Sequence, residues 1–553
     1  MNVKTLKIIA FVLAVVLTVG CLAACGNKAE NPADSSAPVS SGSASGESSA
    51  ESGEITPNED PIPLSSKKPA FSVSDSTLTM DEMLKTYRGY TNYRIKQIKE
   101  TKSAIKPEKG GRAFYFSSIH GNDNNNGLSE SKPIKSISKI ETIGLKPGDV
   151  VYLERGSIWR TPFVAPSSHI KYTAYGSGAK PQLYASPANY ANESLWKQTD
   201  AKNIYCISNV GNADIGAVIF NNGEKCGVKC TIRTEASGTY NHTTGERYNS
   251  YKDLTGNLHF YHDRSTGKLY LRCNEGNPGK IFKDIEMNIK QNIITVAGEY
   301  NTFDNICFKY TGAHGIKAMN HDNSDGLTVQ NCEFYWIGGS ILSDSFLGRN
   351  YPTRYGNGVE IYGDAHKYTV NNCYFYEIYD TAVTFQSDTA PGNTHVEMQD
   401  IKVTNNVMEY CTWGVEYFLD GGDDADCFLE NVSIDNNLMW YAGFGALPEQ
   451  RTDIRAEGHI KGWTTSDNNC KGNFTITNNL FAMGISTIIQ VGAERTSDLP
   501  RFSGNTYIQS TTRQLGYSIK NGDPMRRGSF TNVRDYIVSN FFDKKAQIVY
   551  VKE

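Results

Sequence analysis

The sequence predicts an all-β solenoid, and three features of residues 305–505 support this prediction. A short phrase recurs there: an Asn or Asn-Asn pair, a few apolar residues, then a small residue followed by a β-branched one. Its copies start at intervals ranging from 26 residues (331 − 305) to 42 residues (479 − 437). Segments such as Val359-Glu360-Ile361-Tyr362 alternate with the two-residue period of a strand. A recurring phrase separated by variable inserts is typical of a solenoid, in which each repeat forms one coil.

The asparagines of this phrase are expected to form a structural ladder. They are Asn305, Asn331, Asn372, Asn406, Asn437, Asn479 and Asn505. Asn tolerates left-handed backbone dihedrals at a turn, and its side-chain amide can bond to the Asn of the next coil. We therefore interpret these residues as turn and ladder residues and look for the active site elsewhere.

The start of the predicted solenoid carries the most specific family pattern. Phe114-Tyr-Phe116 is followed by the loop Gly121-Asn-Asp-Asn-Asn-Asn-Gly127, by Lys146-Pro-Gly-Asp-Val-Val-Tyr-Leu153 and by Gly156-Ser-Ile-Trp-Arg160. With the Asn repeats, this order resembles the right-handed parallel β-helix of the pectate lyase-like superfamily, from Ala113 to the C-terminus. The resemblance implies a lyase, glycoside hydrolase or epimerase that acts on a polysaccharide. The Asn/Asp-rich loop is explained by turn chemistry, with calcium ligation as the alternative.

The N-terminal residues predict export and a membrane anchor. Residues 1–24 contain Lys4 and Lys7 before an apolar run, as in a secretory signal. Leu22-Ala-Ala-Cys25 resembles a bacterial lipobox, which implies a lipid on Cys25, attachment to the membrane and an extracytoplasmic location. Residues 25–66 are rich in Ser, Gly and Glu and read as a disordered tether.

Two further segments interrupt the expected coils. Residues 67–112 predict a helical segment with a capping box at Thr79 and Glu82, which we expect to cover the first coil. Within the β-helix domain, residues 113–553, the phrase fades between 195 and 289. Hairpin signals such as those before Lys268-Leu-Tyr-Leu271 predict a β insertion there.

Composition narrows the class of protein. The net charge of −4 lacks the excess of basic residues that is typical of nucleic-acid-binding proteins. Cys332 and Cys373 share one coil position, which favours buried thiols over disulfides, and Cys226-x-x-x-Cys230 has no matching Cys/His pair to complete a zinc site. We expect a monomer that requires no cofactor.

The chemistry is expected where acidic residues of successive coils align. Two places after the small residue lie Lys317, Glu360, Thr384, Glu416 and Leu447, and four places further lie His321, Asp364, Asp388, Asp420 and Arg451. Strands in a parallel stack lie about 4.8 Å apart, so these acids would be roughly 5 to 10 Å from one another. Glycoside hydrolysis needs two carboxyl groups at about this separation. The predicted acid and base come from Asp364, Asp388, Asp420, Glu360 and Glu416.

The residues expected to bind sugar surround these acids. Arg354 and Tyr355 belong to a long insert that is suited to covering sugar units, and Gln386, Phe418 and Glu449 lie one outward step beyond the first column. His321, Lys317 and Arg451 complete the predicted substrate-binding set.

The predicted function is glycoside hydrolysis of a polysaccharide, and two alternatives remain open. The acids would bind Ca²⁺ in a lyase or C5-epimerase acting on a uronate-containing glycan, with Arg354, Lys317 or Arg451 as the base. The protein would instead be a carbohydrate-binding surface protein if these acids are only turn residues.

Overall fold

The computed structural model describes residues 62–318, 325–345, 348–363, 365–388, 395–420, 426–452, 458–462, 473–492, 499–513, 515–519 and 543–552. The predicted signal segment, the lipidation residue Cys25 and nearly all of the tether lie outside these ranges. Among the helices within them, none combines the length and the apolar character that a membrane span requires.

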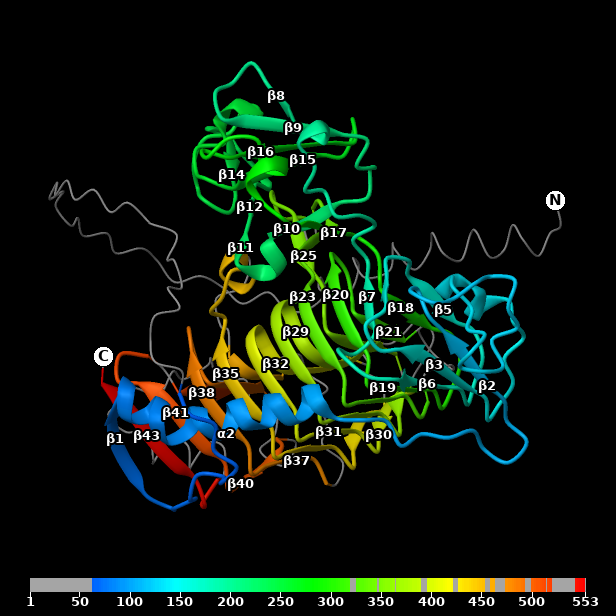
Figure 1. Ribbon diagram of the computed structural model, residues 1–553. Coiled ribbons are helices and arrows are strands. Elements are labelled where there is room, and N and C mark those ends of the chain that lie inside the picture. The colour runs from blue at the N-terminus through cyan, green and yellow to red at the C-terminus, as the bar shows by residue number, and fades with distance from the viewer. Residues whose placement is uncertain are drawn as a thin grey trace, which may run out of the picture.

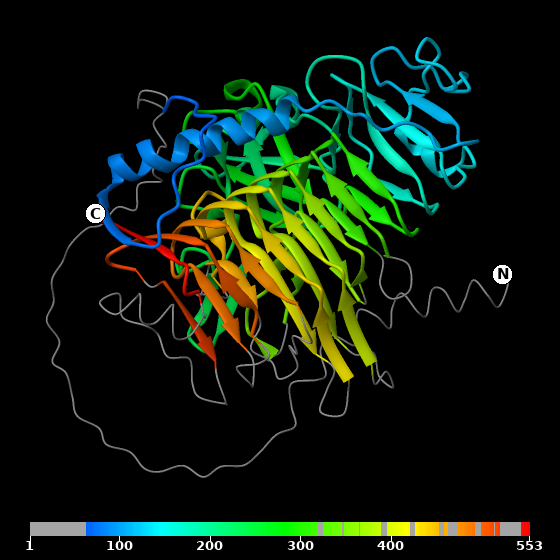
Figure 2. The same ribbon diagram turned by 90° about the horizontal axis from the view of Figure 1, so that it is seen from below.

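The described chain winds into coils whose strands form three parallel faces, which confirms the predicted β-helix (Figures 1 and 2). Every strand pair of the first face is parallel. This face consists of β2 (Ala113–Phe116), β3 (Val150–Glu154), β6 (Lys171–Tyr175), β19 (Thr302–Asp304), β22 (Thr328–Gln330), β28 (Thr369–Asn371), β31 (Lys402–Thr404), β34 (Ser433–Asp435), β37 (Thr475–Thr477) and β40 (Arg501–Ser503).

The second and third faces belong to one continuous sheet, because β29 (Tyr374–Asp388) and β32 (Val407–Asp420) run through both. The second face adds β4 (Ile158–Trp159), β7 (Gln182–Tyr184), β20 (Cys307–Thr311), β23 (Glu333–Ile337), β35 (Leu438–Ala442), β38 (Leu480–Gly484), β41 (Thr506–Ser510) and β43 (Gln547–Lys552). The third face adds β5 (Phe163–Ala165), β18 (Ile294–Val296), β21 (Ile316–Ala318), β26 (Val359–Tyr362), β36 (Gly458–Gly462), β39 (Ile489–Gly492) and β42 (Gly516–Ile519).

The interior of the coils is a column of stacked apolar side chains. Phe308, Phe334 and Phe375 stack with ring centroids 4.8 and 4.6 Å apart on successive coils. Cys332 and Cys373 are buried free thiols in adjacent coils, as the sequence predicts, and the backbone N–H of Cys332 donates to Sγ of Cys373. A single coil buries little apolar surface by itself, so the stability of the fold comes from contacts between neighbouring coils.

The asparagines form two adjacent ladders where the sequence predicts one. Asn405, Asn436 and Asn478 adopt positive φ at the turn, in register with Asn331 and Asn372. The next residue along is buried, and Asn406, Asn437, Asn479 and Asn505 bond to one another through Oδ1 at 2.9 to 3.1 Å. The predicted alignment is therefore wrong by one residue for the later coils, because an Asn-Asn pair supplies both ladders.

The N-terminal segment lies at the other end of the solenoid from the place expected. β1 (Asp75–Thr79) pairs with β43 in the last coil, and α2 (Met80–Glu100) begins with the predicted Thr79–Glu82 capping box. The helix then crosses the second face, where its apolar side packs on side chains of β29, β32, β35, β38 and β43 (Figure 1). The expectation that this segment covers the first coil is wrong, since strand pairing with β43 fixes its start at the last one.

The insertion forms a separate lobe above the second face (Figure 1). Most of its strand pairs are antiparallel, and its own apolar core includes Trp196, Phe220 and Phe260. It comprises β8 (Lys197–Gln198), β9 (Ile204–Ser208), β10 (Ile215–Phe220), β11 (Lys225–Cys226), β12 (Val228–Lys229), β13 (Ile232–Glu235), β14 (Gly238–Asn241), β15 (His259–Asp263), β16 (Lys268–Arg272), β17 (Ile285–Ile289), α3 (Pro278–Ile281) and the 3-10 helices η2 (Glu193–Leu195), η3 (Asn221–Gly223) and η4 (Tyr251–Asp253).

Several short elements lie outside the three faces of the solenoid. The hairpin β24 (Ser340–Ser343) and β25 (Thr353–Tyr355) lies between β23 and β26, and a short parallel sheet joins β27 (Ala365–His366), β30 (His395–Gln399) and β33 (Asp426–Glu430). Two 3-10 helices, η1 (Ile137–Glu141) and η6 (Pro448–Gln450), complete the described elements.

Candidate active site

A column of charged and polar side chains runs along the third face. The strand registers align Lys317 of β21, Glu360 of β26, Thr384 of β29, Glu416 of β32, Lys461 of β36 and Gln490 of β39. Their strand neighbours, such as Val359 and Val415, belong to the apolar core, so these residues project to the outside of the coil. The predicted register therefore holds from Lys317 through Glu416.

Glu360 and Glu416 are the two carboxylates of this column. They lie on strands separated by one strand, β29, which corresponds to about 9 to 10 Å at the usual spacing of strands. Although they project outward, they are only 6% and 4% exposed. Burial in this setting strengthens every charge interaction that they make.

A second column, one that the sequence interpretation missed, connects the two acids. Asn357 donates from Nδ2 to Oε2 of Glu360 at 2.8 Å, and its Oδ1 accepts from the backbone N–H of Thr381 at 2.9 Å. The hydroxyl of Thr381 then donates to Oε2 of Glu416 at 2.8 Å. Both residues are buried. This chain of hydrogen bonds fixes the two carboxyl groups relative to each other.

His314 belongs to the same second column and lies beside Glu360. Its Nδ1 lies 2.6 Å from Oε2 of Glu360 and accepts the backbone N–H of Asn357 at 3.1 Å. Burial alone would raise the pKa of Glu360, but His314, Lys317 and the Asn357 amide together lower it to about 2. Glu360 is therefore an ionised carboxylate and is unsuited to donate a proton.

The second column carries a signal that was available in the sequence. His314, Asn357, Thr381 and Trp413 each precede the small residue of their phrase, Gly315, Gly358, Ala382 and Gly414. Thr381 and Trp413 are partners in the strand register. Inspecting the position before the small residue, as well as the position after it, would have found these side chains.

Two buried polar atoms in the first column have no hydrogen-bond partner among the described residues. They are Oγ1 of Thr384, between the two glutamates, and Oε1 of Gln490, beyond Lys461. Both side chains are almost fully buried. Buried polar atoms are nearly always paired in native proteins, so these atoms indicate where a bound hydroxyl group or water would be held.

The coil that follows Glu416 departs from the prediction. Gly458 pairs with Trp413 and Lys461 pairs with Glu416, so Lys461 takes the place expected for Leu447. The described residues 443–452 lie between β35 and β36 outside the column, so the placement of Arg451 in the acid column is wrong. Arg451 instead forms an ion pair with Asp380 and lies 4.4 Å above the ring of Trp413. Glu449 lies on η6 outside the outer column, so its expected position there is also wrong; its Oε1 accepts from the N–H of Gly445.

The other predicted sugar-binding residues differ in where they lie relative to the paired glutamates. Tyr355 lies beside the site, with its ring 5.1 Å from that of His314. Arg354 is buried and donates to the carbonyl oxygens of Gly339 and Gly216 at 2.6 and 3.0 Å, so it holds the hairpin on the insertion. Gln386 and Phe418 are half-buried register partners in the next outward column.

Several predicted residues lie beyond what the structure describes. Asp364 and His321 are outside the described ranges, and Asp388 and Asp420 are described only as backbone partners at the ends of β29 and β32. Within the described part of the chain, no group of three His, Cys, Asp or Glu side chains could hold a metal ion.

One acid that the sequence interpretation did not select has a strongly perturbed environment. Glu377 of β29 is buried, and burial raises its pKa to about 8 despite hydrogen bonds from the backbone N–H groups of Leu447 and Ala446. It holds the segment at Ala446 and Leu447 and has no described contact with Glu360 or Glu416.

The fold and the site define a parallel β-helix protein with paired, buried carboxylates on one outer face. No protein-family model matches the chain. Lacto-N-biosidase from Bifidobacterium longum subsp. longum is 41% identical over 85 residues, which is 15% of this chain and 5% of that protein. The chain thus spans only a small part of that relative.

Solved structures with a similar backbone fold include two enzymes that act on sugars. A protein titled glycoside hydrolase aligns with a TM-score of 0.44 and 10% identity over 80% of this chain and 97% of its own. The native GH136 lacto-N-biosidase from Eubacterium ramulus aligns with a TM-score of 0.38 and 12% identity over 85% of this chain and 72% of its own.

Proposed function

We propose that the protein is a carbohydrate-active enzyme that hydrolyses glycosidic bonds of a polysaccharide or oligosaccharide at the third face. The observation that carries this proposal is the pair Glu360 and Glu416, held two strands apart by Asn357 and Thr381. The name of the relative that matches over 85 residues, a lacto-N-biosidase, supports a sugar substrate.

The spacing favours hydrolysis with inversion of the anomeric centre. Carboxyl groups about 9 to 10 Å apart leave room for a water molecule between base and sugar, whereas a covalent intermediate needs roughly 5 Å. Glu360, ionised because its pKa lies near 2, activates this water. Glu416 donates the proton to the leaving oxygen, and Oγ1 of Thr384 binds a group between them.

The test compares Glu360→Gln and Glu416→Gln with the wild type on a panel of neutral and acidic glycans. Each substitution is expected to lower kcat by at least about 10³-fold, because each removes one of two groups needed in the transition state. Glu409→Gln is the matched control: Glu409 is a buried glutamate of the same strand as Glu416, but it pairs with Arg88 on the second face. New reducing ends, with the anomer assigned by NMR, are the readout.

The same assay separates the alternatives. An unsaturated uronate that absorbs in the ultraviolet and is lost with EDTA would replace the hydrolase by a lyase. Glycan binding without any product would replace it by a binding protein. Unchanged turnover in Glu360→Gln would remove the site assignment.

We also propose that the chain is anchored outside the cytoplasm through a lipid on Cys25. The support is the resemblance of Leu22-Ala-Ala-Cys25 to a lipobox and the Ser/Gly-rich tether after it. Metabolic labelling with a fatty acid is expected to mark the wild type and to leave Cys25→Ser unlabelled and released from the membrane.

A further inference from the structure

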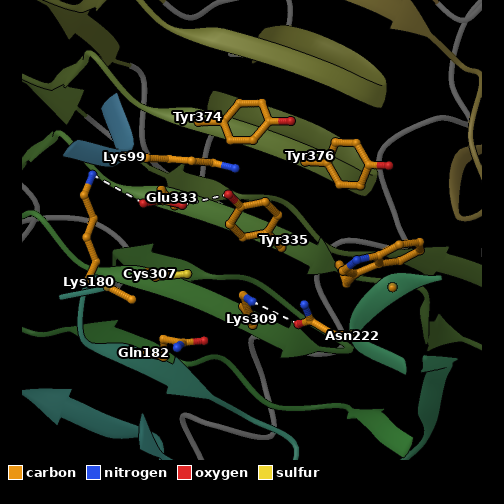
Figure 3. Close-up of a pocket in the computed structure, with 13 residues that line it drawn as sticks. Lys99, Lys180, Gln182, Asn222, Cys307, Lys309, Glu333, Tyr335, Tyr374 and Tyr376 are labelled. Carbon is orange, nitrogen blue, oxygen red and sulfur yellow. Dashed lines mark hydrogen bonds and ion pairs between the residues drawn. The ribbon is translucent and has the colours of Figure 1, made fainter. Parts of the chain in front are cut away.

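A cavity of about 480 Å³ opens on the second face (Figure 3). Neither of the paired glutamates, Glu360 and Glu416, lines it. Its floor is the outward side of β7, β20, β23 and β29, and its rim includes Lys99 from α2 and Asn222 from η3 of the insertion. The solenoid, the helix and the insertion therefore each contribute to this cavity, and sequence analysis assigned no role to its residues.

Aromatic side chains line the cavity, among them Tyr335, Trp336, Tyr374 and Tyr376. Tyr335 and Tyr374 meet edge to face at 5.5 Å, and Trp336 and Tyr376 do so at 6.1 Å. Tyr and Trp each combine an apolar ring with a polar edge. This lining suits a sugar ring, which has apolar C–H faces and polar hydroxyl edges.

Two of the three lysines of the cavity keep their charge available to a ligand. The Nζ of Lys99 lies 5.7 and 5.4 Å from the ring centroids of Tyr335 and Tyr374, and that of Lys309 lies 5.0 Å from the centroid of Tyr335. Lys309 also donates to Oδ1 of Asn222 at 3.3 Å. Among the described residues, neither lysine has a carboxylate at ion-pair distance.

The third lysine and the acid of the cavity neutralise each other. Lys180 is buried, donates to the carbonyl oxygens of Ile98 and Asn331, and lies 3.5 Å from Glu333. Glu333 also accepts from the hydroxyl of Tyr335 at 2.7 Å. Since Lys180 binds the end of α2 at Ile98, it also fixes the place of Lys99. The charge left in the cavity is positive.

We propose that this cavity is a second, non-catalytic binding site for a sugar unit that carries an anionic group. Its rings pack against the sugar, and Lys99 and Lys309 bind the anion. Glu333 is the single carboxylate among the residues lining the cavity, so the pair of acids that hydrolysis needs is missing there. The choice of a sugar rests on the proposed function, whereas the positive charge follows from the lysines themselves.

The test measures binding by calorimetry to the full chain carrying Glu360→Gln, which keeps the probe intact. The probes are trigalacturonate, its fully methyl-esterified form, which removes the charge and keeps the rings, and a sulfated trisaccharide. The acidic probes are expected to bind at least about five-fold more tightly than the ester, and added salt is expected to reduce the difference. Binding of either acidic probe supports the site and identifies its anion.

Lys99→Gln and Lys96→Gln locate the site. Both lysines are exposed on α2, but Lys96 faces Glu100 at 3.9 Å and does not line the cavity. Lys99→Gln is expected to weaken the acidic probe by about five-fold, with Lys96→Gln unchanged. Equal effects of the two substitutions, equal binding of ester and acid, or no binding of either acid at millimolar concentration would overturn the proposal.

The outcome is independent of the catalytic test. Lys99→Gln in the wild-type chain is expected to leave turnover of a short soluble substrate unchanged. Binding that depends on Lys99, in a protein that cleaves no glycan, would support this site and remove the proposed hydrolase.

Discussion

Nδ1 of His314 lies 2.6 Å from Oε2 of Glu360, and both side chains are buried beneath the outer surface of the third face. This contact, with Lys317 on the neighbouring strand, makes the ionised form of Glu360 more stable in the folded protein than in the unfolded chain. The pairing of these residues therefore links the stability of the fold to pH.

We predict an acid-sensitive contribution of Glu360 to stability. Its pKa is about 2 in the folded protein against an ordinary value of 4.5, so its stabilisation is fully present above pH 4.5 and is lost as the pH falls toward 2. The full contribution is about 3 kcal/mol. Chemical unfolding of the wild type and Glu360→Gln between pH 7 and 3 is expected to show a stability difference that narrows below pH 4.5.

An exposed glutamate provides the control for this pH series. Glu235 in the insertion is exposed and pairs with Arg233 at the surface, so Glu235→Gln is expected to change stability little at any pH of the series. A difference between wild type and Glu360→Gln that stays constant from pH 7 to 3 would contradict the assigned low pKa.

Thr381 is predicted to position Glu416 for catalysis. Thr381→Val removes the hydroxyl that donates to Oε2 of Glu416 but keeps the shape of the side chain. We expect kcat to fall by about 10- to 100-fold with little change in KM, since this bond orients a group that acts in the transition state. Thr381→Ser, which restores the hydroxyl, should recover most of the activity. A loss that Thr381→Ser fails to restore would indicate a packing role alone.

The positions of the coils could be predicted because the residues that define each coil lie close together in the sequence. The small residue and its β-branched neighbour set the strand register, and this placed Glu360, Thr384 and Glu416 correctly in one column. The coil containing Lys461 failed because its insert carries its own Gly445-Ala446, which imitates the phrase. Such a copy can be rejected only from the pairing of Gly458 with Trp413, a contact between segments distant in sequence.

Contacts between segments distant in sequence also explain the other features that were not predicted. The pairing of β1 with β43 joins the two ends of the described chain, and no pattern within residues 67–112 specifies this partner. The cavity at Lys99 needs the solenoid, the helix and the insertion together. Asn357 and Thr381 lie beside the coil phrase, but their role follows from hydrogen bonds between coils.

The buried asparagine ladder is predicted to be a major source of stability. Asn437 accepts through Oδ1 from Asn406 and donates to Oδ1 of Asn479, and Nδ2 also donates to the carbonyl oxygen of Val403. Asn437→Ala leaves several buried polar groups without partners, so we expect a loss of about 2 to 4 kcal/mol in the free energy of unfolding. Ser433→Ala, at a half-buried strand position in the same coil, should lose less than about 0.5 kcal/mol. Equal midpoints of urea unfolding for the two variants would contradict a structural ladder.

The insertion is predicted to be fastened to the solenoid through Asp214, whose buried ion-pair partner Lys229 belongs to the insertion itself. Asp214 also accepts the backbone N–H of Ile341 in β24 at 2.7 Å, so this pair lies where the insertion meets the hairpin of the coil. Removing one partner leaves the other charge buried, and we expect Asp214→Asn to cost about 3 to 5 kcal/mol.

The double variant Asp214→Leu with Lys229→Met should regain much of this loss, because no uncompensated charge remains. Asp200→Asn breaks the exposed pair with Lys252 and is expected to change stability little. Hydrogen exchange localises the effect: faster exchange in β10 and β24 of Asp214→Asn, with β35 and β38 unchanged, is the expected result. Exchange that accelerates uniformly through the solenoid would show that the pair supports the whole fold and not the attachment of the insertion.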